Sequence, residues 1–155
     1  MSKTWSTLEL QSVPGHRVRR IHQLVVALFM QEVGEINLTP VQFSALQTIC
    51  TQPSIDQKTL ARTIGYDAAT TGGVIDRLEA RGLVVRKVAP NDRRARQITP
   101  TERGLQTLKA AVPRVLKSQS LFLAPLTKAE RREFMRLLKV LIDANAELSN
   151  IPAKQ

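Results

Sequence analysis

Two short helical segments joined by a tight turn restrict the fold of this chain more than any other feature. Residues 56–64 place their apolar side chains on one face of a short helix, and Gly65 begins a turn after it. Asp67 is well placed to cap a second helix over residues 68–81, and Gly82 is typical of a residue that ends one. Two helices connected in this way form a helix-turn-helix pattern.

The hydrophobic pattern changes directly after this second helix. Residues 83–88 are rich in β-branched side chains, residues 89–92 have the composition of a turn, and residues 93–98 predict a returning strand. A β-hairpin that follows a helix-turn-helix is a wing. We therefore expect residues 38–98 to form a winged helix-turn-helix domain.

Long amphipathic helices are predicted on both sides of this domain. One begins near His16 and ends by Asn37, and a capping sequence at residues 99–102 opens another that Pro113 should kink. A similar capping sequence at residues 126–130 opens the last helix. These helices have more apolar surface than a small domain can bury, so they should pack on one another or on a second chain. The expected fold is mainly α with a small β-hairpin wing.

The charge of the chain favours a polyanionic partner. Lysine and arginine total 23 against 13 acidic residues, which gives a formal net charge of +10 and points to DNA, RNA or an anionic membrane. The sequence shows neither an apolar run long enough to span a membrane nor the pattern of a signal peptide, so we expect a cytoplasmic protein without a membrane partner.

The sequence holds no pattern typical of an enzyme. It shows no nucleophile elbow, phosphate-binding loop or cluster of metal ligands, and we expect neither catalysis nor a cofactor. The spacing of His16 and His22 does not suit a chelate, so no metal site is predicted. Cys50 is the single cysteine and lies in phase with apolar neighbours, which favours a core thiol, although a redox-sensing role stays open.

Three stretches of the sequence resemble the MarR family of bacterial transcriptional regulators: DRLEARGLV at residues 76–84, NDRR at 91–94 and IT at 98–99. The resemblance implies a homodimer that binds a pseudo-palindromic operator in double-stranded DNA. Residues 1–37 and 99–155 would form the dimerisation region, and residues 1–37 would also contribute to a ligand site. Many family members lose DNA affinity when a small aromatic anion binds between that region and the DNA-binding domain.

The helix expected to read DNA departs from the family pattern. Its first residues, Ala68, Ala69, Thr70 and Thr71, are small, so direct contacts to base edges should be modest. The two threonines could instead help to cap the helix. Two consecutive glycines at residues 72–73 stand where family members usually carry larger polar residues, at a cost of roughly 1 kcal/mol each in helix propensity.

The predicted wing carries most of the basic residues of the DNA-binding domain. Residues 81–97 contain six basic side chains and one acid, a net charge of +5. An arginine at the tip can enter a narrow minor groove, although a solvated run of charge is the simpler alternative. The resemblance implies that Asp92 orients Arg77 or Arg94. The residues expected to contact DNA are Lys58, Arg62, Ala68, Ala69, Thr70, Thr71, Arg77, Arg86, Arg93, Arg94 and Arg96.

A second candidate site lies at the start of the first long helix. His16 and Arg20 are four residues apart and share a helical face, and His22 lies beside apolar positions. A guanidinium beside imidazoles suits an aromatic carboxylate, and Trp5 and Phe43 could contact its ring. The segment also resembles family members that control the catabolism of aromatic acids. Alternatively, the arginines are exposed or contact DNA, and His22 is a core or interface residue.

These observations together predict a homodimeric regulator of transcription. We expect a repressor of an aromatic-compound catabolic operon that is released by a small aromatic carboxylate, similar to a hydroxybenzoate or a hydroxynicotinate. One alternative is a constitutive or architectural DNA-binding protein without a ligand, which would bind DNA independently of sequence and with a steep salt dependence. A regulator that responds to oxidation of Cys50 is another.

Overall fold

The structure is a computed structural model that describes residues 8–148. Helices dominate it, and its one sheet in these residues is a two-stranded hairpin. In chain order the elements are η2 (Leu10–Ser12), α1 (Pro14–Val33), η3 (Gly34–Ile36), α2 (Pro40–Thr51), α3 (Gln57–Ile64), α4 (Ala68–Ala80), β1 (Val84–Ala89), β2 (Asp92–Pro100), α5 (Glu102–Leu123) and α6 (Lys128–Ala144). The expected fold class, mainly α with a β-hairpin wing, is confirmed.

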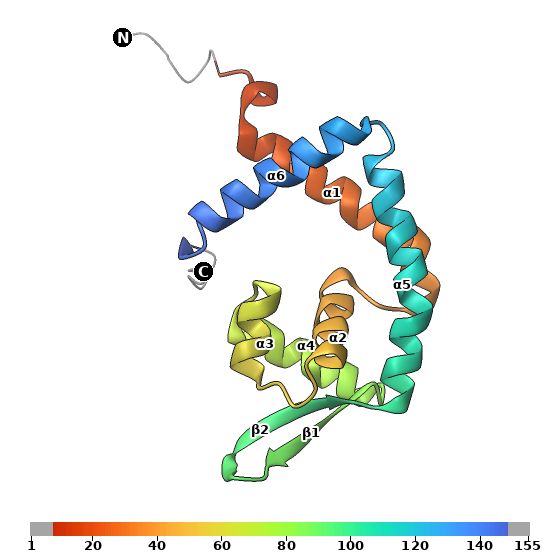
Figure 1. The fold of residues 1–155 in the computed structure, drawn as a ribbon, viewed down its shortest axis with the longest axis vertical. Coiled ribbons are helices and arrows are strands. Elements are labelled where there is room, and N and C mark those ends of the chain that lie inside the picture. Colours follow the sequence, from red (N-terminus) through yellow and green to blue (C-terminus); the bar gives the residue numbers. More distant parts are fainter. Residues whose placement is uncertain (1–7, 149–155) are drawn as a thin grey trace.

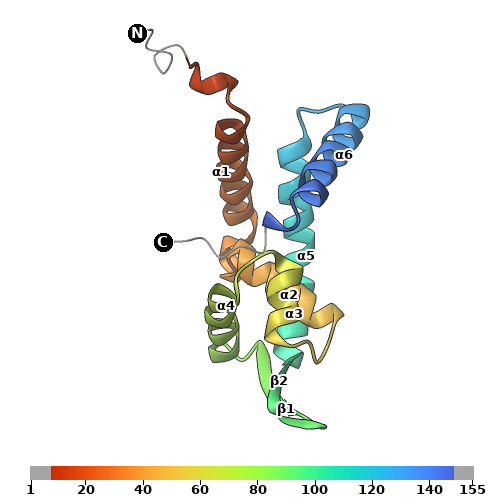
Figure 2. The ribbon, with the colours of Figure 1, turned by 90° about the vertical axis from the view of Figure 1, so that its left-hand side faces the viewer.

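The elements separate into an upper and a lower region (Figures 1 and 2). α1 and α5 pack against each other, and α6 turns back from the end of α5. The three helices α2, α3 and α4 lie below them, and the hairpin projects from the lower end of the molecule. The predicted helix-turn-helix and the wing therefore lie together at the lower end of the molecule.

Side-chain caps explain where most of the helices begin. Thr39 and Gln42 form a capping box at the start of α2, with the Thr39 N–H donating to Gln42 Oε1 at 3.0 Å. Thr127 and Glu130 form the second capping box at α6. Thr101 caps α5 because its hydroxyl oxygen accepts the Gly104 N–H at 3.0 Å, and this helix continues through Pro113. Local hydrogen bonds of this kind satisfy backbone donors that a helix leaves unpaired.

The hydrophobic core lies in the lower region. Most of its largest fully buried side chains come from α2, α3, α4 and the base of the hairpin, and they include Leu46, Ile49, Leu60, Ile75 and Leu78. By contrast, the long helices of the upper region expose many apolar side chains, and α6 contains no buried residue. The helix-turn-helix thus packs around a core that also receives Phe29 and Val33 from α1 and Ala111 from α5, while the upper helices leave apolar surface uncovered.

The hairpin is anchored to the core at its base. β1 and β2 pair antiparallel with Val84 opposite Pro100, and the register shifts after Val88, near the tip. Ile98 makes a further bridge to Ile55 in the α2–α3 connection, where the Ile98 N–H donates to the Ile55 carbonyl at 2.8 Å. This third partner fixes the base of the wing against the helix-turn-helix and leaves its tip in solvent.

Within the described residues, no single helix is long and apolar enough to cross a membrane. The bent combination of residues 14–36 with α2, which turns by 66°, passes the same criterion by length and composition alone.

Candidate nucleic-acid interface

The exposed N-terminus of α4 is the first part of the candidate interface. Asp67 caps the helix, because its Oδ1 accepts the Thr70 N–H at 2.7 Å and its Oδ2 accepts the Thr70 hydroxyl at 2.6 Å. These bonds, with the Thr70 hydroxyl contributing most, hold the pKa of Asp67 below its ordinary value. Ala68, Ala69 and Thr70 are exposed. The first turn therefore presents small side chains and a rigid backbone to the surroundings.

The position of Thr71 differs from the expectation that this residue contacts DNA. Its side chain is fully buried, and its hydroxyl donates to the Asp67 carbonyl at 2.8 Å. A helix turns about 100° per residue, so position 71 shares the inward face of Val74, Ile75 and Leu78 instead of the outward face of its neighbours. The prediction that Thr71 contacts DNA is wrong.

The two glycines of α4 have different surroundings. The Gln57 amide Nε2 donates to the Ala68 carbonyl at 3.0 Å, and a Cβ added at Gly72 would lie only 2.9 Å from that nitrogen. Gly72 thus leaves room for a side chain that connects α3 to α4. No atom lies within 4 Å of a Cβ built at Gly73. Sequence reasoning missed Gln57, because its partner is a backbone carbonyl eleven residues away.

The wing supplies exposed arginines. Arg93, Arg94 and Arg96 are exposed on β2, near the tip. Asp92 Oδ1 accepts the backbone N–H of Arg94 at 2.9 Å, so this carboxylate shapes the turn. Within residues 8–148 it pairs with neither the Arg77 nor the Arg94 guanidinium, which corrects the pairing that the family resemblance implied.

Arg86 connects the wing to α4. Its Nη1 lies 2.6 Å from Glu79 Oε2, its backbone N–H donates to Glu79 Oε1 at 2.9 Å, and its Nη2 lies 2.5 Å from Asp76 Oδ1. The two Arg86 bonds to Glu79, with the backbone N–H contributing most, hold the pKa of Glu79 below its ordinary value. Because two carboxylates already compensate the Arg86 charge, this arrangement does not favour the predicted contact with DNA.

The other cations that are predicted to contact DNA lie on the helix-turn-helix and the wing. Each is exposed, and none makes a hydrogen bond or ion pair through its charged group with another residue in the described part of the chain. Charged side chains without a local partner are available to phosphate oxygens. They are Lys58 and Arg62 on α3, Arg77 on α4, and Arg93, Arg94 and Arg96 on the wing.

The sequence of the lower region matches a known family of regulators. The sequence profile of the MarR family matches residues 38–95. Over 131 residues the chain is 32% identical to the HTH-type transcriptional repressor NicR of Pseudomonas putida, an alignment that spans 84% of this chain and 83% of NicR. The chain belongs to the MarR family. It is therefore a DNA-binding regulator of transcription, in agreement with the family resemblance of its sequence.

Solved structures of MarR-family regulators share the whole arrangement of helices. BpsR of Bordetella bronchiseptica, whose DNA binding is regulated by 6-hydroxynicotinic acid, superposes with a TM-score of 0.84 at 31% identity, over 88% of this chain and 97% of BpsR. The transcriptional repressor CouR of Rhodococcus jostii, in a complex with a 23-mer DNA duplex, gives a TM-score of 0.81 at 30% identity, over 86% and 94% of the two chains. The names of these proteins describe regulators of transcription or of DNA binding.

The predicted ligand residues of this MarR-family chain are only partly brought together. His16 and Arg20 do lie on α1, where His16 Nε2 is buried without a hydrogen-bond partner among the described residues and His16 Nδ1 lies 3.5 Å from Arg19 Nη2. Arg20 and His22 are exposed. The exposure of His22 does not fit a core histidine.

The aromatic residues expected at this site have other surroundings. Phe43 is half-buried on α2 and meets the ring of Phe29 edge to face, with centroids 6.0 Å apart. Trp5 lies outside the described residues. Within residues 8–148, no hydrogen bond or ring contact joins Phe43 to His16, Arg20 or His22. The grouping of these side chains around one ligand therefore stays a prediction.

Cys50 has the environment of a structural thiol. It is half-buried and packs against the core, and burial raises its pKa above the ordinary value. A reactive cysteine requires a lowered pKa, because the thiolate is the species that reacts with oxidants. The environment of Cys50 thus favours the core interpretation over the redox alternative.

Proposed function

We propose that this MarR-family regulator is a homodimeric repressor that binds a pseudo-palindromic operator and leaves it when a small aromatic carboxylate binds. The observation that carries the DNA part is that the exposed α4 N-terminus and the wing lie at the same end of the molecule, and that Arg93, Arg94 and Arg96 of the wing have no partner for their guanidiniums within residues 8–148. The complex of CouR with a 23-mer DNA duplex supports DNA binding by this fold.

The two parts of the interface suit different grooves of DNA. The first turn of α4 enters the major groove, where Thr70 can hydrogen-bond to a base or phosphate and Ala68 and Ala69 can contact thymine methyl groups. Arg93 and Arg94 extend from the wing into the adjacent minor groove. Because the readers on α4 are small, the arginines and the shape of the DNA carry much of the specificity. In a dimer, the two half-sites are about 34 Å apart, one turn of the duplex.

The effector site is proposed on α1. The Arg20 guanidinium can bind a carboxylate, and the buried His16 Nε2 has an unsatisfied hydrogen-bonding capacity that a ring hydroxyl or ring nitrogen can meet. A hydroxybenzoate or hydroxynicotinate offers both groups. The regulation of BpsR by 6-hydroxynicotinic acid supports this chemical class, and an operon for aromatic catabolism is the corresponding target.

The first experiment titrates the full chain against a fluorescent duplex from its own upstream region, beside a scrambled duplex, at physiological salt. We expect tight binding to the native duplex only. Arg94→Ala should weaken it at least about tenfold, because a charge-assisted contact to DNA is lost. Lys109→Ala removes an equal charge from α5, outside the interface, and should leave the affinity close to that of the unmodified chain.

The same titration is repeated with benzoate, 4-hydroxybenzoate and 6-hydroxynicotinate. One of these acids should release the duplex from the unmodified chain, and Arg20→Gln should abolish the release without weakening DNA binding. Equal binding to both duplexes that no acid affects would support the architectural alternative instead. An unchanged affinity of the Arg94→Ala variant would contradict the proposed role of the wing.

A further inference from the structure

The first turns of α3 and α4 are joined by one side chain. Asp56 caps α3 by accepting the Thr59 N–H at 2.9 Å, in the same way that Asp67 caps α4. Gln57 follows the cap of α3, and its amide Nε2 donates to the carbonyl of Ala68, which follows the cap of α4. Each cap fixes only its own helix, whereas this bond joins the two.

The contact depends on a residue from each helix. In the described part of the chain, it is the one side-chain hydrogen bond between α3 and α4. Gln57 is half-buried, and a Cβ at Gly72 would lie only 2.9 Å from its Nε2. A change at either position therefore disturbs the same contact.

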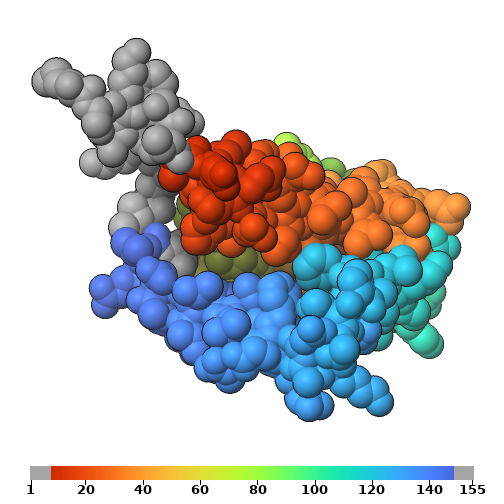
Figure 3. Space-filling view, turned by 90° about the horizontal axis from the view of Figure 1, so that it is seen from above, coloured from red at the N-terminus to blue at the C-terminus, as the bar shows by residue number. Residues whose placement is uncertain are grey.

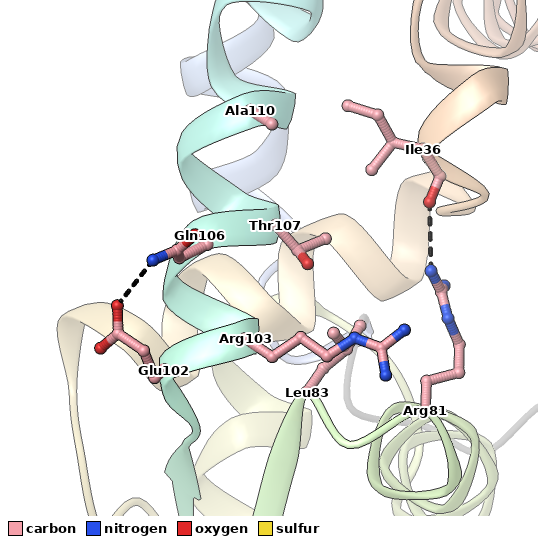
Figure 4. A pocket seen from close by; sticks show the side chains of 8 residues that line it. All are labelled: Ile36, Arg81, Leu83, Glu102, Arg103, Gln106, Thr107 and Ala110. Atoms are coloured by element: carbon pink, nitrogen blue, oxygen red, sulfur yellow. Dashed lines mark hydrogen bonds between the residues drawn. The ribbon is translucent and has the colours of Figure 1, made fainter.

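The opposite end of α4 is held by other elements. Arg81, which follows the helix, donates from Nη2 to the Ile36 carbonyl at 3.1 Å and lines a cleft beside α5 together with Arg103 (Figure 4). Near the same end, two carboxylates of α4 bind Arg86 of the wing. Hydrogen bonds thus fix the C-terminal end of α4 to η3 and β1, while the Gln57 amide connects its N-terminal end to α3.

This arrangement makes the first turn of α4 the part that moves when the Gln57 contact is lost. A helix of 13 residues is about 20 Å long, so a tilt of about 3° around its C-terminal end displaces its N-terminal end by about 1 Å. Hydrogen bonds to base edges keep their strength over only about half an ångström. Ala68, Ala69 and Thr70, the residues proposed to read the major groove, lie in this turn.

We propose that Gln57 is a positioning residue for sequence recognition, which holds the first turn of α4 at the depth and angle at which it reads DNA. The contact stands on the structure alone, and its effect on recognition rests on the proposed function. A phosphate contact adds affinity for every duplex, whereas a positioning residue changes the discrimination between sequences. The two roles can therefore be separated by measurement.

The test compares the affinities of the full chain for the operator duplex and for a scrambled duplex. Gln57→Met keeps the length of the side chain and removes its donor, and it should lower the ratio of the two affinities by about three- to tenfold, as for a weakened base contact. Lys58→Met, at the next residue, should weaken binding to both duplexes and leave the ratio unchanged. Gln106→Met removes an amide that donates to Glu102 on α5 (Figure 4) and should change neither affinity.

Gly72→Ala tests the same contact from the other helix. Its Cβ displaces the amide while Gln57 remains, and alanine favours the helix, so a lower ratio cannot result from a weaker α4. The combined Gln57→Met and Gly72→Ala variant should have the ratio of either single variant, because both remove one contact. Additive effects would overturn the assignment of both residues to one contact. An unchanged ratio in Gln57→Met, or an equal loss of affinity for both duplexes, overturns the positioning role.

Hydrogen exchange without DNA decides the contact itself. The backbone amides of residues 70–72 should exchange about fivefold faster in Gln57→Met, relative to those of residues 74–78, because the first turn opens more easily without this bond. Equal exchange overturns the role of Gln57 in fixing the turn. An unmodified chain that does not prefer its operator refutes the proposed function and the effect on recognition with it, while the exchange rates still decide the contact.

Discussion

Gln57 links the two helices of the helix-turn-helix through a single side chain. Its amide donates to the carbonyl of Ala68, the first residue of α4, and Gly72 provides the space that this contact needs. The departure from the family pattern at residues 72–73 thus has a structural reason at one position and not at the other. Gly73 faces open space, and nothing in the structure explains why it is a glycine.

This difference predicts unequal effects of alanine at the two positions. Gly73→Ala should raise the free energy of unfolding by about 1 kcal/mol, the gain in helix propensity. Gly72→Ala should gain less, because its Cβ displaces the Gln57 amide and loses a hydrogen bond worth about 1 kcal/mol. Urea denaturation at a fixed protein concentration measures both.

The control for this pair is the same comparison in a Gln57→Ala background. There the Gly72→Ala gain should rise to match that of Gly73→Ala, since no amide remains to be displaced. Equal gains at both positions in the unmodified chain would refute the role assigned to Gln57.

At the scale of elements, the orientation of the wing depends on Arg86. Bonds from one guanidinium to Asp76 and Glu79 fix β1 against α4, while the bridge from Ile98 to Ile55 holds the opposite strand. The wing is therefore supported on both strands near its base. The arginines of the tip extend from this support and depend on it for their position.

Glu79→Gln should weaken operator binding several-fold, because the wing is oriented less firmly, and should lower stability at neutral pH by no more than about 1 kcal/mol. The Arg86 contacts lower the folded-state pKa of Glu79, so its contribution is present above the unfolded pKa of about 4.3 and is lost as the pH falls through the folded value. The stability difference between the variant and the unmodified chain should accordingly shrink below about pH 4.

Denaturation between pH 3 and pH 7 and an operator titration check this prediction. Glu133→Gln is the matched control, because Glu133 pairs with Arg136 on α6, away from the wing. A stability difference that persists unchanged at pH 3, or equal operator affinity for both variants, would count against the role of Glu79.

At the scale of the whole molecule, the upper region lacks a cover for its apolar surface. Seen from above, α1 and α6 occupy opposite sides, and parts of the lower region are visible between them (Figure 3). α6 exposes Met135, Leu137, Val140, Leu141 and Ile142. Apolar side chains exposed around much of a helix without buried residues are typical of an interface, and a second copy of the chain is the partner expected in this family.

Leu141→Glu should convert the dimer into monomers, because it places a charge in the apolar interface. Sedimentation equilibrium at micromolar concentration measures the change. Most of the helical signal should remain, since the core lies in the lower region and does not include α6. Arg132→Glu introduces the same side chain at an exposed position of α6 and should remain dimeric. A monomeric unmodified chain, or a dimeric Leu141→Glu variant, would contradict this interface.

Local signals predicted the fold well. The capping boxes at Thr39 and Thr127 and the change of period after α4 are written in neighbouring residues, so the helix starts and the hairpin follow from the sequence. The burial of Thr71 also had a local signal, because residues 71, 74, 75 and 78 share one helical face.

Contacts between segments that are far apart in the sequence could not be predicted from local patterns. In the sequence, Arg86 cannot be distinguished from the other basic residues of the wing. Only the fold shows that it lies beside Asp76 and Glu79. The cleft at Arg81 and Arg103 likewise depends on the packing of α5 against the turn after α4. The grouping of His16 and Arg20 followed from helical spacing alone, whereas the ring contact of Phe43 with Phe29 did not.

Gly104 has a consequence for how the chain length can vary. A Cβ at this position would lie 2.0 Å from the Leu83 carbonyl oxygen, so α5 returns directly against the residue from which the hairpin departs. The hairpin therefore begins and ends at one place in the fold. Insertions or deletions at the tip of the hairpin, made in matched pairs across β1 and β2, change the reach of the wing without moving anything else. Wings of different length can thus occur on the same fold. This change alone can fit the protein to operators with differently spaced minor grooves.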